Sequence, residues 1–448
     1  MEKIWQKNTA SLQEVETFTV GKDRELDLLL APYDVLGSIA HVTMLGSVGL
    51  LDASEVRVLV EKLREIHALV TEGGFTLEEG VEDIHSQVEL MLTRMLGDAG
   101  KKIHSARSRN DQVLVDLKLF LRSELGRLMG EVRVFFDQLQ EKSETYKDHL
   151  FPGYTHLQLA MPSSFGLWFG AYAESLVDDA IQLRAAYAVV NKNPLGSAAG
   201  YGSSFPIDRT QTTRLLGFDD LNYNVVYAQM GRGKTERVVA MALAGVAETL
   251  GRLSMDACLY LNQNFDFISF PAELTTGSSI MPHKKNPDVF ELIRSNCNRI
   301  KALPGEVMMM TTNLPSGYHR DLQLLKEHLF PAFRTLTECL RMAQLMLAHV
   351  TIRKDILREE KYRYVFSVEV VNRLVLAGVP FRDAYRQVGL DIESGRFAYE
   401  GDVRHTHEGS IGNLCTDAIR TMMEQVMHSF PFAQVSTAEN SLLGKIST

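Results

Sequence analysis

Residues 277–291 guide the interpretation of the whole chain; they read Gly-Ser-Ser-Ile-Met-Pro-His-Lys-Lys-Asn-Pro-Asp-Val-Phe-Glu. A glycine followed by two serines lets the backbone bend and approach a ligand closely. Lys284 and Asn286 then offer a charge and an amide two residues apart, and Asp288 is placed to start a helix. A solvent-exposed polar loop is the alternative. Because hydroxyls, a cation and an amide together are suited to gripping a carboxylate and removing a proton beside it, we predict a catalytic loop.

The stretch resembles the signature of the fumarase/aspartase superfamily, Gly-Ser-Ser-x-Met-Pro-x-Lys-x-Asn, at every fixed position. Members of that superfamily are homotetrameric, largely helical lyases that release fumarate from a succinyl substrate. The resemblance therefore implies an all-α fold of three domains, in which a central bundle of long helices forms a multi-helix core in a homotetramer. It implies neither a metal nor an organic cofactor.

The composition is that of an ordinary globular protein. The chain has 448 residues, of which 45% are hydrophobic and 23% charged, and its net charge of -9 argues against a nucleic-acid partner. Four widely spaced cysteines indicate free thiols in a reducing compartment. Charged residues stand at the N-terminus where a signal peptide needs an apolar run, and the longest uncharged stretch, residues 35–51, is short for a membrane span. We expect a cytoplasmic protein with no membrane partner.

Apolar residues repeat at spacings of three and four over residues 117–139, which predicts one long helix with a continuous apolar stripe. Further long helices are predicted over residues 163–190, 235–262, 288–310 and 322–350. Narrow apolar stripes bury little within one chain, so we expect other subunits to complete the bundle. The expected domains are an N-terminal helical domain (1–103), a central long-helix domain with the signature loop (104–350) and a small C-terminal helical domain (351–448).

Residues 104–112, His-Ser-Ala-Arg-Ser-Arg-Asn-Asp-Gln, combine two arginines, two serines and amides where the first long helix starts. This composition favours anion binding, although a charged cluster on its own is more often a solvated surface. The string resembles the motif His-x-Gly-Arg-Ser-Arg-Asn-Asp-Gln of the argininosuccinate lyases, one family of the superfamily, with Ala106 in place of the glycine. The resemblance implies that Ser108, Arg109 and Asn110 bind the substrate.

Residues 153–158, Gly-Tyr-Thr-His-Leu-Gln, match a second motif of that family. A histidine in a turn bounded by glycine and proline can pass a proton, although a lone loop histidine is usually only a hydrogen-bonding residue. Adenylosuccinate lyases, an alternative family, usually have Arg-Thr-His at this point. The resemblance implies that Thr155 and His156 are catalytic and that His156 pairs with Glu291, the residue that closes the signature.

Two further segments are similar to parts of the family's substrate cleft. Residues 82–89 place His85 and Glu89 one helical turn apart. Because the family has a similar Glu-Asp-x-His segment along its cleft, the resemblance makes His85 a substrate-binding residue. Residues 318–326 match the family pattern at four positions that the resemblance also assigns to substrate binding: Tyr318, Arg320, Gln323 and Lys326.

Residues 229–235 depart from the family, which usually has Ser-Asp-Arg-Asp in this segment. The string Gly-Arg-Gly-Lys-Thr within it would suggest a P-loop, but Ala228 stands where that motif requires glycine, and no buried strand precedes it. We therefore interpret the segment as a helix start and reject nucleotide binding.

Taken together, the resemblance implies an elimination that cleaves argininosuccinate into arginine and fumarate, as in arginine biosynthesis. Ser278 would be the base, Lys284 and Asn286 would hold the carboxylate on which negative charge develops, and His156 would act at the leaving nitrogen. The alternatives are adenylosuccinate lyase or another fumarate-releasing lyase, and a non-enzymatic relative of the crystallin type. The site strings lie at opposite ends of long helices, so we expect each site of a homotetramer to combine strings from different subunits.

Overall fold

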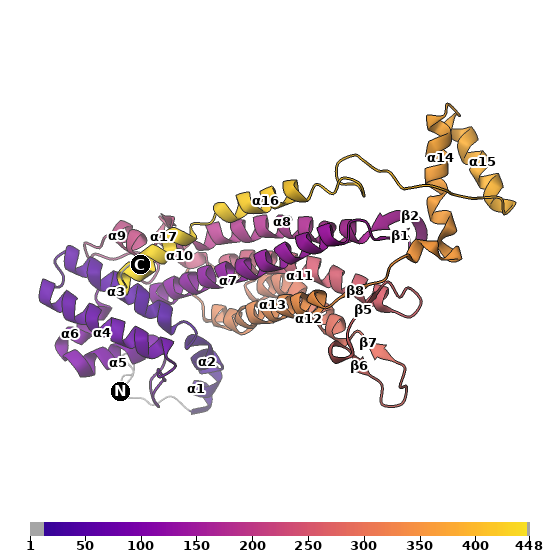
Figure 1. Cartoon of the computed structure of the whole chain (residues 1–448). Coiled ribbons are helices and arrows are strands. Elements are labelled where there is room, and N and C mark those ends of the chain that lie inside the picture. The colour runs from indigo at the N-terminus through magenta and orange to yellow at the C-terminus, as the bar shows by residue number, and fades with distance from the viewer. Residues whose placement is uncertain (1–12, 446–448) are drawn as a thin grey trace.

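Five long helices run side by side along the molecule (Figure 1). The computed structural model, which describes residues 13–445, places them at α7 (Arg109–Thr145), α8 (Phe165–Val190), α11 (Lys234–Leu261), α12 (Asp288–Met310) and α13 (Leu325–Ala348). Helix α7 packs on α8 and α13, and α11 packs on α8 and α12. Their buried side chains belong to one continuous core, so the predicted long-helix bundle is confirmed.

Helix α7 is the longest element, with 37 residues, which correspond to about 55 Å at 1.5 Å per residue. A capping box starts it, because the side chains of Ser108 and Asp111 each accept a hydrogen bond from the backbone of this first turn. The predicted apolar stripe faces the core, since every one of its members is buried: Leu117, Leu121, Leu125, Leu128, Val132, Phe136 and Leu139.

The N-terminal helices cover the start of α7 (Figure 1). They are α1 (Gln13–Val20), α2 (Asp23–Asp27), α3 (Ala31–Ser47), α4 (Ala53–Thr71), α5 (Ile84–Leu96) and α6 (Asp98–Lys101). Asp52 caps α4 with a complete capping box. Residues 1–8, whose charges argued against a signal peptide, lie outside the described residues.

Short strand pairs join the helices. The longest pair is the antiparallel hairpin of β1 (Leu150–Thr155) and β2 (Gln158–Ser164), at the far end of α7. The others are two residues long: β3 (Lys192–Asn193) with β4 (Asp220–Leu221), β5 (Ile268–Ser269) with β8 (Thr351–Ile352), and β6 (Thr276–Gly277) with β7 (Lys285–Asn286). Two short helices, α9 (Arg209–Leu215) and α10 (Val225–Met230), precede α11. The all-α prediction holds, because these pairs only close loops.

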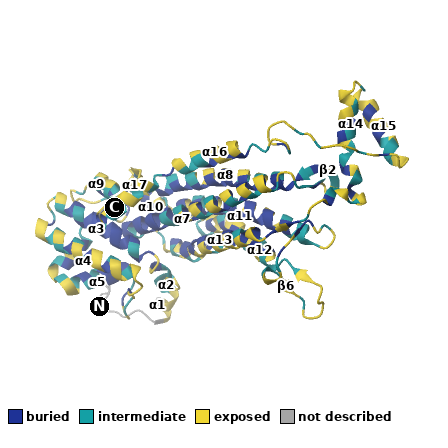
Figure 2. Cartoon of the chain, in the orientation of Figure 1, coloured by how far each residue is buried: buried dark blue, intermediate teal, exposed yellow. Residues whose placement is uncertain are grey.

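The last hundred residues fall into two packing groups. Helices α14 (Ser367–Leu376) and α15 (Phe381–Glu393) form a small lobe with its own core. The chain then returns along the bundle, where α16 (Thr416–His428) packs on α8 and α17 (Phe432–Leu442) packs on α3 and α9. Figure 2 shows the buried residues concentrated along the bundle, whose helices also carry exposed and intermediate residues, whereas exposed and intermediate residues make up most of the lobe. The division into three domains remains a prediction.

Among the described residues, α11 is the one helix long and apolar enough to cross a membrane, and 61% of its apolar window is buried inside the molecule. The segment 17–27 passes the same test only together with 31–47, to which it is bent by 80°. Because most of its apolar window is buried inside the molecule, α11 has the character of a core helix.

Candidate active site

A cleft lies where α7 begins. Its cavity of about 190 Å³ is enclosed by α1, α2, the segment before α5, the first turn of α7 and the segment that leads into α13. Six of the predicted substrate-binding residues line it: Arg109, Asn110, Tyr318, Arg320, Gln323 and Lys326. Arg320 and Gln323 each donate a hydrogen bond of 3.0 Å to the backbone carbonyl of Thr19, which ties the two sides of the cleft together.

Arg109 is held in this cleft by the segment before α5. Its Nε lies 2.9 Å from Asp83 Oδ2, its Nη1 lies 3.2 Å from Glu82 Oε2, and its Nη2 donates to Ser86 Oγ at 2.7 Å. Burial opposes the ionisation of Asp83, but His85 and Arg109 outweigh it and hold the pKa of that carboxyl well below its ordinary range. The arginine is oriented but stays 34% exposed, so it can still meet an anion.

Lys326 forms a buried charge at the bottom of the cleft. Its Nζ lies 2.5 Å from Asp23 Oδ1 and 2.6 Å from Asp27 Oδ1. Burial would lower the pKa of Lys326, but the two carboxylates raise it above its ordinary value. The two aspartates are spaced four residues apart, which places them on one helix face, and this spacing is the signal in the sequence that could have identified them.

Charges of both signs line the cleft. The cations are Arg109, Arg232, Arg320 and Lys326, and the acids are Asp23, Asp27, Glu82 and Asp83. Such a lining suits a ligand that is itself zwitterionic, because each of its charged groups can find a group of opposite sign.

The segment that departs from the family starts α11, as predicted. The backbone N–H of Gly233 donates to Glu236 at 2.6 Å, and Arg232 Nε donates to the same carboxylate at 2.7 Å. Arg232 Nη2 also donates to the carbonyl of Leu322 at 2.8 Å. Arg232 is therefore a buried structural cation in the cleft wall.

Ser108 and Ala106 precede the cleft residues Arg109 and Asn110 in the sequence and shape the start of α7. The hydroxyl of Ser108 accepts a hydrogen bond from Asn110 N at 3.3 Å, so it caps the helix, and Ser108 lies outside the cavity lining. Ala106 has a φ of 62°, in the left-handed region that favours glycine. This conformation gives a physical reason for the glycine of the family motif.

His85 does not face the cleft, contrary to the expectation from the family's Glu-Asp-x-His segment. It is only 5% exposed, and its Nε2 lies 2.8 Å from Asp116 Oδ2 inside the molecule. The helical phase of α5 turns the side chain inward, toward Asp34 of α3 and Asp116 of α7, and away from the residues that line the cleft.

His156 and Thr155 lie at the tip of the β1–β2 hairpin, exposed to solvent. His156 and Leu157 both have positive φ, 53° and 58°, which is uncommon for residues other than glycine and characteristic of the tight hairpin turn called type I′. Leu157 is 78% exposed. The turn therefore presents an imidazole and an apolar side chain outward.

Ser278 lies in the signature loop, residues 276–287, which β6 and β7 close as a projecting hairpin (Figure 1). Its Oγ accepts hydrogen bonds from Ile280 N at 3.3 Å and Met281 N at 3.1 Å. Two N–H dipoles aimed at this oxygen favour negative charge on it.

Lys284, Asn286 and Glu291 line a second cavity, of about 710 Å³, between the signature loop and the C-terminal end of α11. Lys284 and Glu291 are exposed, and Asn286 is half-buried. Within residues 13–445, no hydrogen bond or ion pair connects Glu291 to His156, so their predicted pairing does not occur within one chain.

The predicted site residues thus form two groups that a single chain keeps apart. The cleft lies at the start of α7, and the hairpin with His156 lies beyond its other end, about 55 Å away along the helix axis. The signature loop projects at that same far end (Figure 1). One chain therefore holds the binding groups and the reacting groups at separate places.

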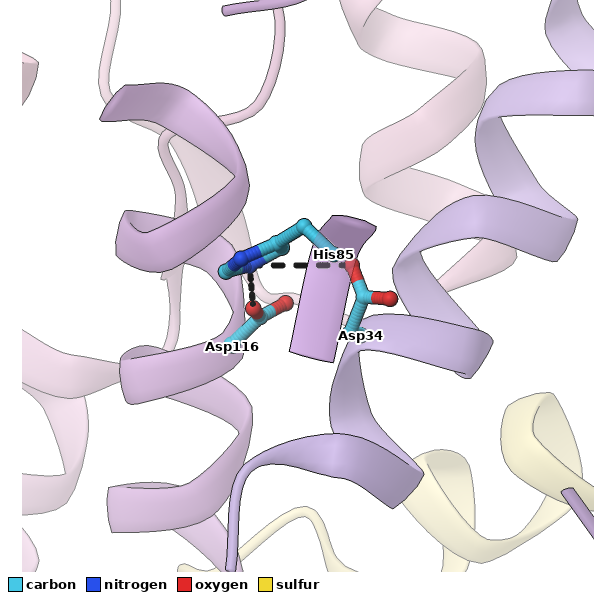
Figure 3. A group of neighbouring side chains, drawn as sticks. All are labelled: Asp34, His85 and Asp116. Carbon is cyan, nitrogen blue, oxygen red and sulfur yellow. Dashed lines mark hydrogen bonds and ion pairs between the residues drawn. The ribbon is translucent and has the colours of Figure 1, made fainter. Parts of the chain in front are cut away.

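One group of described side chains has the composition of a metal site. Asp34, His85 and Asp116 offer ligand atoms that lie within 4.8 Å of one another, and all three are buried (Figure 3). His85 Nε2 and Asp116 Oδ2 share a hydrogen bond of 2.8 Å, whereas His85 Nδ1 and Asp116 Oδ1 are buried without a hydrogen-bond partner among the described residues.

Comparison with known proteins identifies relatives over the whole chain. The family model described as Lyase matches residues 2–302. Argininosuccinate lyase of Phocaeicola vulgatus is 62% identical over 99% of this chain and all of its own length. The enzymes of that name from Parabacteroides distasonis and Stenotrophomonas maltophilia are 62% and 39% identical, over 99% and 93% of this chain and 99% and 97% of their own.

Solved structures show the same fold. An EDDS lyase in complex with formate has a TM-score of 0.74 at 22% identity and covers 98% of this chain and 96% of its own. A class II fumarase from Schistosoma mansoni has a TM-score of 0.68 at 16% identity, over 91% of each chain. The full-length identity to the curated relatives decides the family. The chain belongs to the argininosuccinate lyase family of the fumarase/aspartase superfamily and is a carbon–nitrogen lyase.

Proposed function

We propose that this chain cleaves argininosuccinate into arginine and fumarate in the cytoplasm, as a step of arginine biosynthesis. The observation that carries the proposal is its identity of 62% to two proteins named argininosuccinate lyase, over 99% of the chain. The match to the first of these proteins runs over 444 residues, so it takes in the segments that hold the predicted site residues.

The cleft supplies the grip on the substrate. Argininosuccinate carries carboxylates, an ammonium and a guanidinium, which matches the balanced lining of the cleft. Arg109, Asn110, Tyr318, Arg320, Gln323 and Lys326 bind it, and Ser108 sets the first turn of α7 that presents the first two of these residues. The buried pairs of Lys326 with Asp23 and Asp27 pre-organise this grip, because they fix the groups before the ligand arrives.

The signature loop and the hairpin carry out the elimination. Ser278 removes the proton from the carbon next to a succinyl carboxylate, Lys284 and Asn286 stabilise the charge that spreads into that carboxylate, and the carbon–nitrogen bond then breaks. Its electron pair goes to the guanidino nitrogen, which receives a proton from His156, assisted by Thr155 and Glu291. The backbone N–H groups of Ile280 and Met281 support the negative charge that Ser278 needs.

We further propose a homotetramer in which each site takes the cleft, the hairpin and the signature loop from different subunits. The separation of these strings in one chain supports it, as do large apolar side chains exposed on the long helices: Val134, Ile181, Met241, Leu292 and Met309. Light scattering during size-exclusion chromatography should give about four times the chain mass of 50.3 kDa.

Fumarate release tests the activity. Purified protein is mixed separately with argininosuccinate and with adenylosuccinate, and fumarate is followed by its ultraviolet absorbance, with a Ser278→Ala protein as control. We expect fumarate from argininosuccinate only. Release from adenylosuccinate alone would move the chain to the alternative family, and release from neither would support a non-enzymatic relative of the crystallin type.

A further inference from the structure

Three helices bury one histidine between two aspartates. Asp34 of α3 and Asp116 of α7 approach His85 of α5 from different sides (Figure 3). His85 Nε2 lies 2.8 Å from Asp116 Oδ2 and 3.8 Å from Asp34 Oδ1. The three residues are 1%, 5% and 0% exposed, in the order Asp34, His85, Asp116. Burying three ionisable side chains costs free energy of folding, so we expect the group to have a functional role.

Charge balance favours a proton over a metal ion in this group. The buried Arg107, whose Nη1 donates to Ser38 Oγ, already places a cation beside this group, and burial together with Asp34 raises the pKa of Asp116 to about 7. Burial lowers the pKa of His85, but Asp34, Asp116 and Asp83 outweigh it and raise that pKa well above its ordinary value. A metal ligand would instead be a neutral imidazole.

The other ring nitrogen of His85 lies near Asp83, which lines the cleft. His85 Nδ1 lies 3.7 Å from Asp83 Oδ2, and the same oxygen lies 2.9 Å from Arg109 Nε. The second oxygen of Asp83 accepts a hydrogen bond of 2.9 Å from Ser86 N and so caps α5. Asp83 therefore stands between a buried imidazolium and the arginine that faces the ligand.

We propose that His85 is a positioning residue for the reaction. Anchored on Asp116 and Asp34, its imidazolium holds Asp83 in the orientation that directs the guanidinium of Arg109 into the cleft. The inference rests on the proposed function, because Arg109 is taken to grip a carboxylate of argininosuccinate. In this role His85 acts through Asp83 and Arg109, in place of the direct substrate contact that the family resemblance led us to expect.

Steady-state kinetics of the full-length protein test this role. His85→Gln keeps a hydrogen bond to Asp116 but loses the charge, so the KM for argininosuccinate should rise about tenfold while kcat falls less. His41→Gln is the matched control, because His41 is equally buried, bonds to Ser105 O at 2.8 Å and contacts no acid of the group. This control should lose thermal stability with little change in KM.

A double substitution of His85 and Arg109 distinguishes a positioning role of His85 from a general loss of structure. In an Arg109→Ala background, His85→Gln should add little to KM, since both changes remove the same grip. An unchanged KM in His85→Gln, or a tenfold rise that persists in full without Arg109, would overturn the proposal. If His85→Gln does not fold, the isosteric Asp116→Asn takes its place, with a smaller rise in KM expected and the same coupling test.

Two further results have separate meanings. Stoichiometric zinc in the purified protein, lost to EDTA together with activity, would make His85 a metal ligand and overturn the imidazolium role. Absence of fumarate release by the unsubstituted protein would instead defeat the proposed function. An active unsubstituted protein with an unchanged KM in His85→Gln would defeat the positioning role alone.

Discussion

The two ends of α7 differ in how far one chain completes its part of the site. At the start of the helix, Arg109 and Lys326 are fixed by carboxylates before any ligand arrives, and the cavity is enclosed by several segments of the same chain. At the far end, His156 and Lys284 are exposed and take part in no ion pair among the described residues. The charged groups of the cleft are therefore fixed within one chain, whereas His156 and Lys284 are presented outward, as the proposed sharing of a site between chains requires.

The outward end also carries backbone strain. His156 and Leu157 adopt the left-handed conformation without being glycine, which costs on the order of 1 kcal/mol for each residue. Strain of this kind persists where a turn must present particular side chains, and here it presents an imidazole and an exposed leucine. An ion-paired cleft at one end of α7 thus contrasts with an exposed hairpin at the other end, whose turn holds two adjacent residues in the left-handed conformation.

The largest effect is expected from Ser278→Ala in the signature loop. Loss of the proposed base should lower kcat by about 10²–10⁴. Because the cleft at the other end remains intact, argininosuccinate should still raise the melting temperature of the variant as it does for the unsubstituted protein. Loss of activity with an unchanged rise in melting temperature would show that the two ends of α7 have separate roles. Near-normal turnover would exclude Ser278 as the base.

The second prediction concerns shared sites. His156→Asn and Ser278→Ala, each inactive alone, should regain activity when mixed in equal amounts, unfolded and refolded together. If the two residues of one site come from different chains, about a quarter of the sites in random hybrids receive both unsubstituted residues. Activity near that level is measured by fumarate release. Hybrid tetramers, verified by mass, that remain as inactive as their parents would show that one chain supplies both residues.

The same substitution at the two ends should have unequal effects on stability. Lys326→Met leaves Asp23 and Asp27 facing each other without a cation, which should lower the free energy of unfolding by about 3–5 kcal/mol. Lys284→Met removes an exposed lysine and should change it by less than about 0.5 kcal/mol. Urea denaturation at one protein concentration measures both. Equal losses would contradict the contrast between a paired end and an open end.

The smallest effect is a pH dependence at the paired end. The pKa of His85 is raised in the folded protein, so its imidazolium contributes stability that is fully present below about pH 6.5, the unfolded value, and is lost as pH rises through the folded value. His85→Gln lacks this contribution. The difference in melting temperature between the two proteins should therefore shrink by a few degrees as pH rises into the alkaline range. A gap that widens with pH would mean that the histidine is neutral.

Sequence reasoning predicted the helices more closely than it predicted what their side chains do. Helix α12 has the predicted bounds of 288–310, and α8 and α11 agree within two residues, because long apolar periodicity is hard to imitate by chance. Helix α13 is shorter than the predicted 322–350, since its first residues form a 3-10 turn at Arg320–Leu324. The return of α16 and α17 onto the bundle depends on contacts between segments far apart in the sequence, which no local pattern reveals.

Prediction of the site met a comparable limit. The cleft brings together Arg109, Asn110 and Lys326, whose motifs are recognisable in isolation. The inward direction of His85 could not be predicted, because its motif identifies the segment but not the direction in which α5 turns the side chain. Asp23 and Asp27 were missed because two acids on a short helix look like surface residues until Lys326, about 300 positions later, is placed between them.

The length of α7 also constrains how chains of this architecture can change over generations. Insertion or deletion of a single residue in a helix turns one end relative to the other by about 100° and moves it by about 1.5 Å. In the proposed tetramer, the cleft and the hairpin would then no longer face their counterparts on neighbouring chains. The extended connection between α15 and α16 tolerates added residues at low cost. Relatives should therefore differ in the length of such connections while the span from Arg109 to Thr145 keeps its residue count.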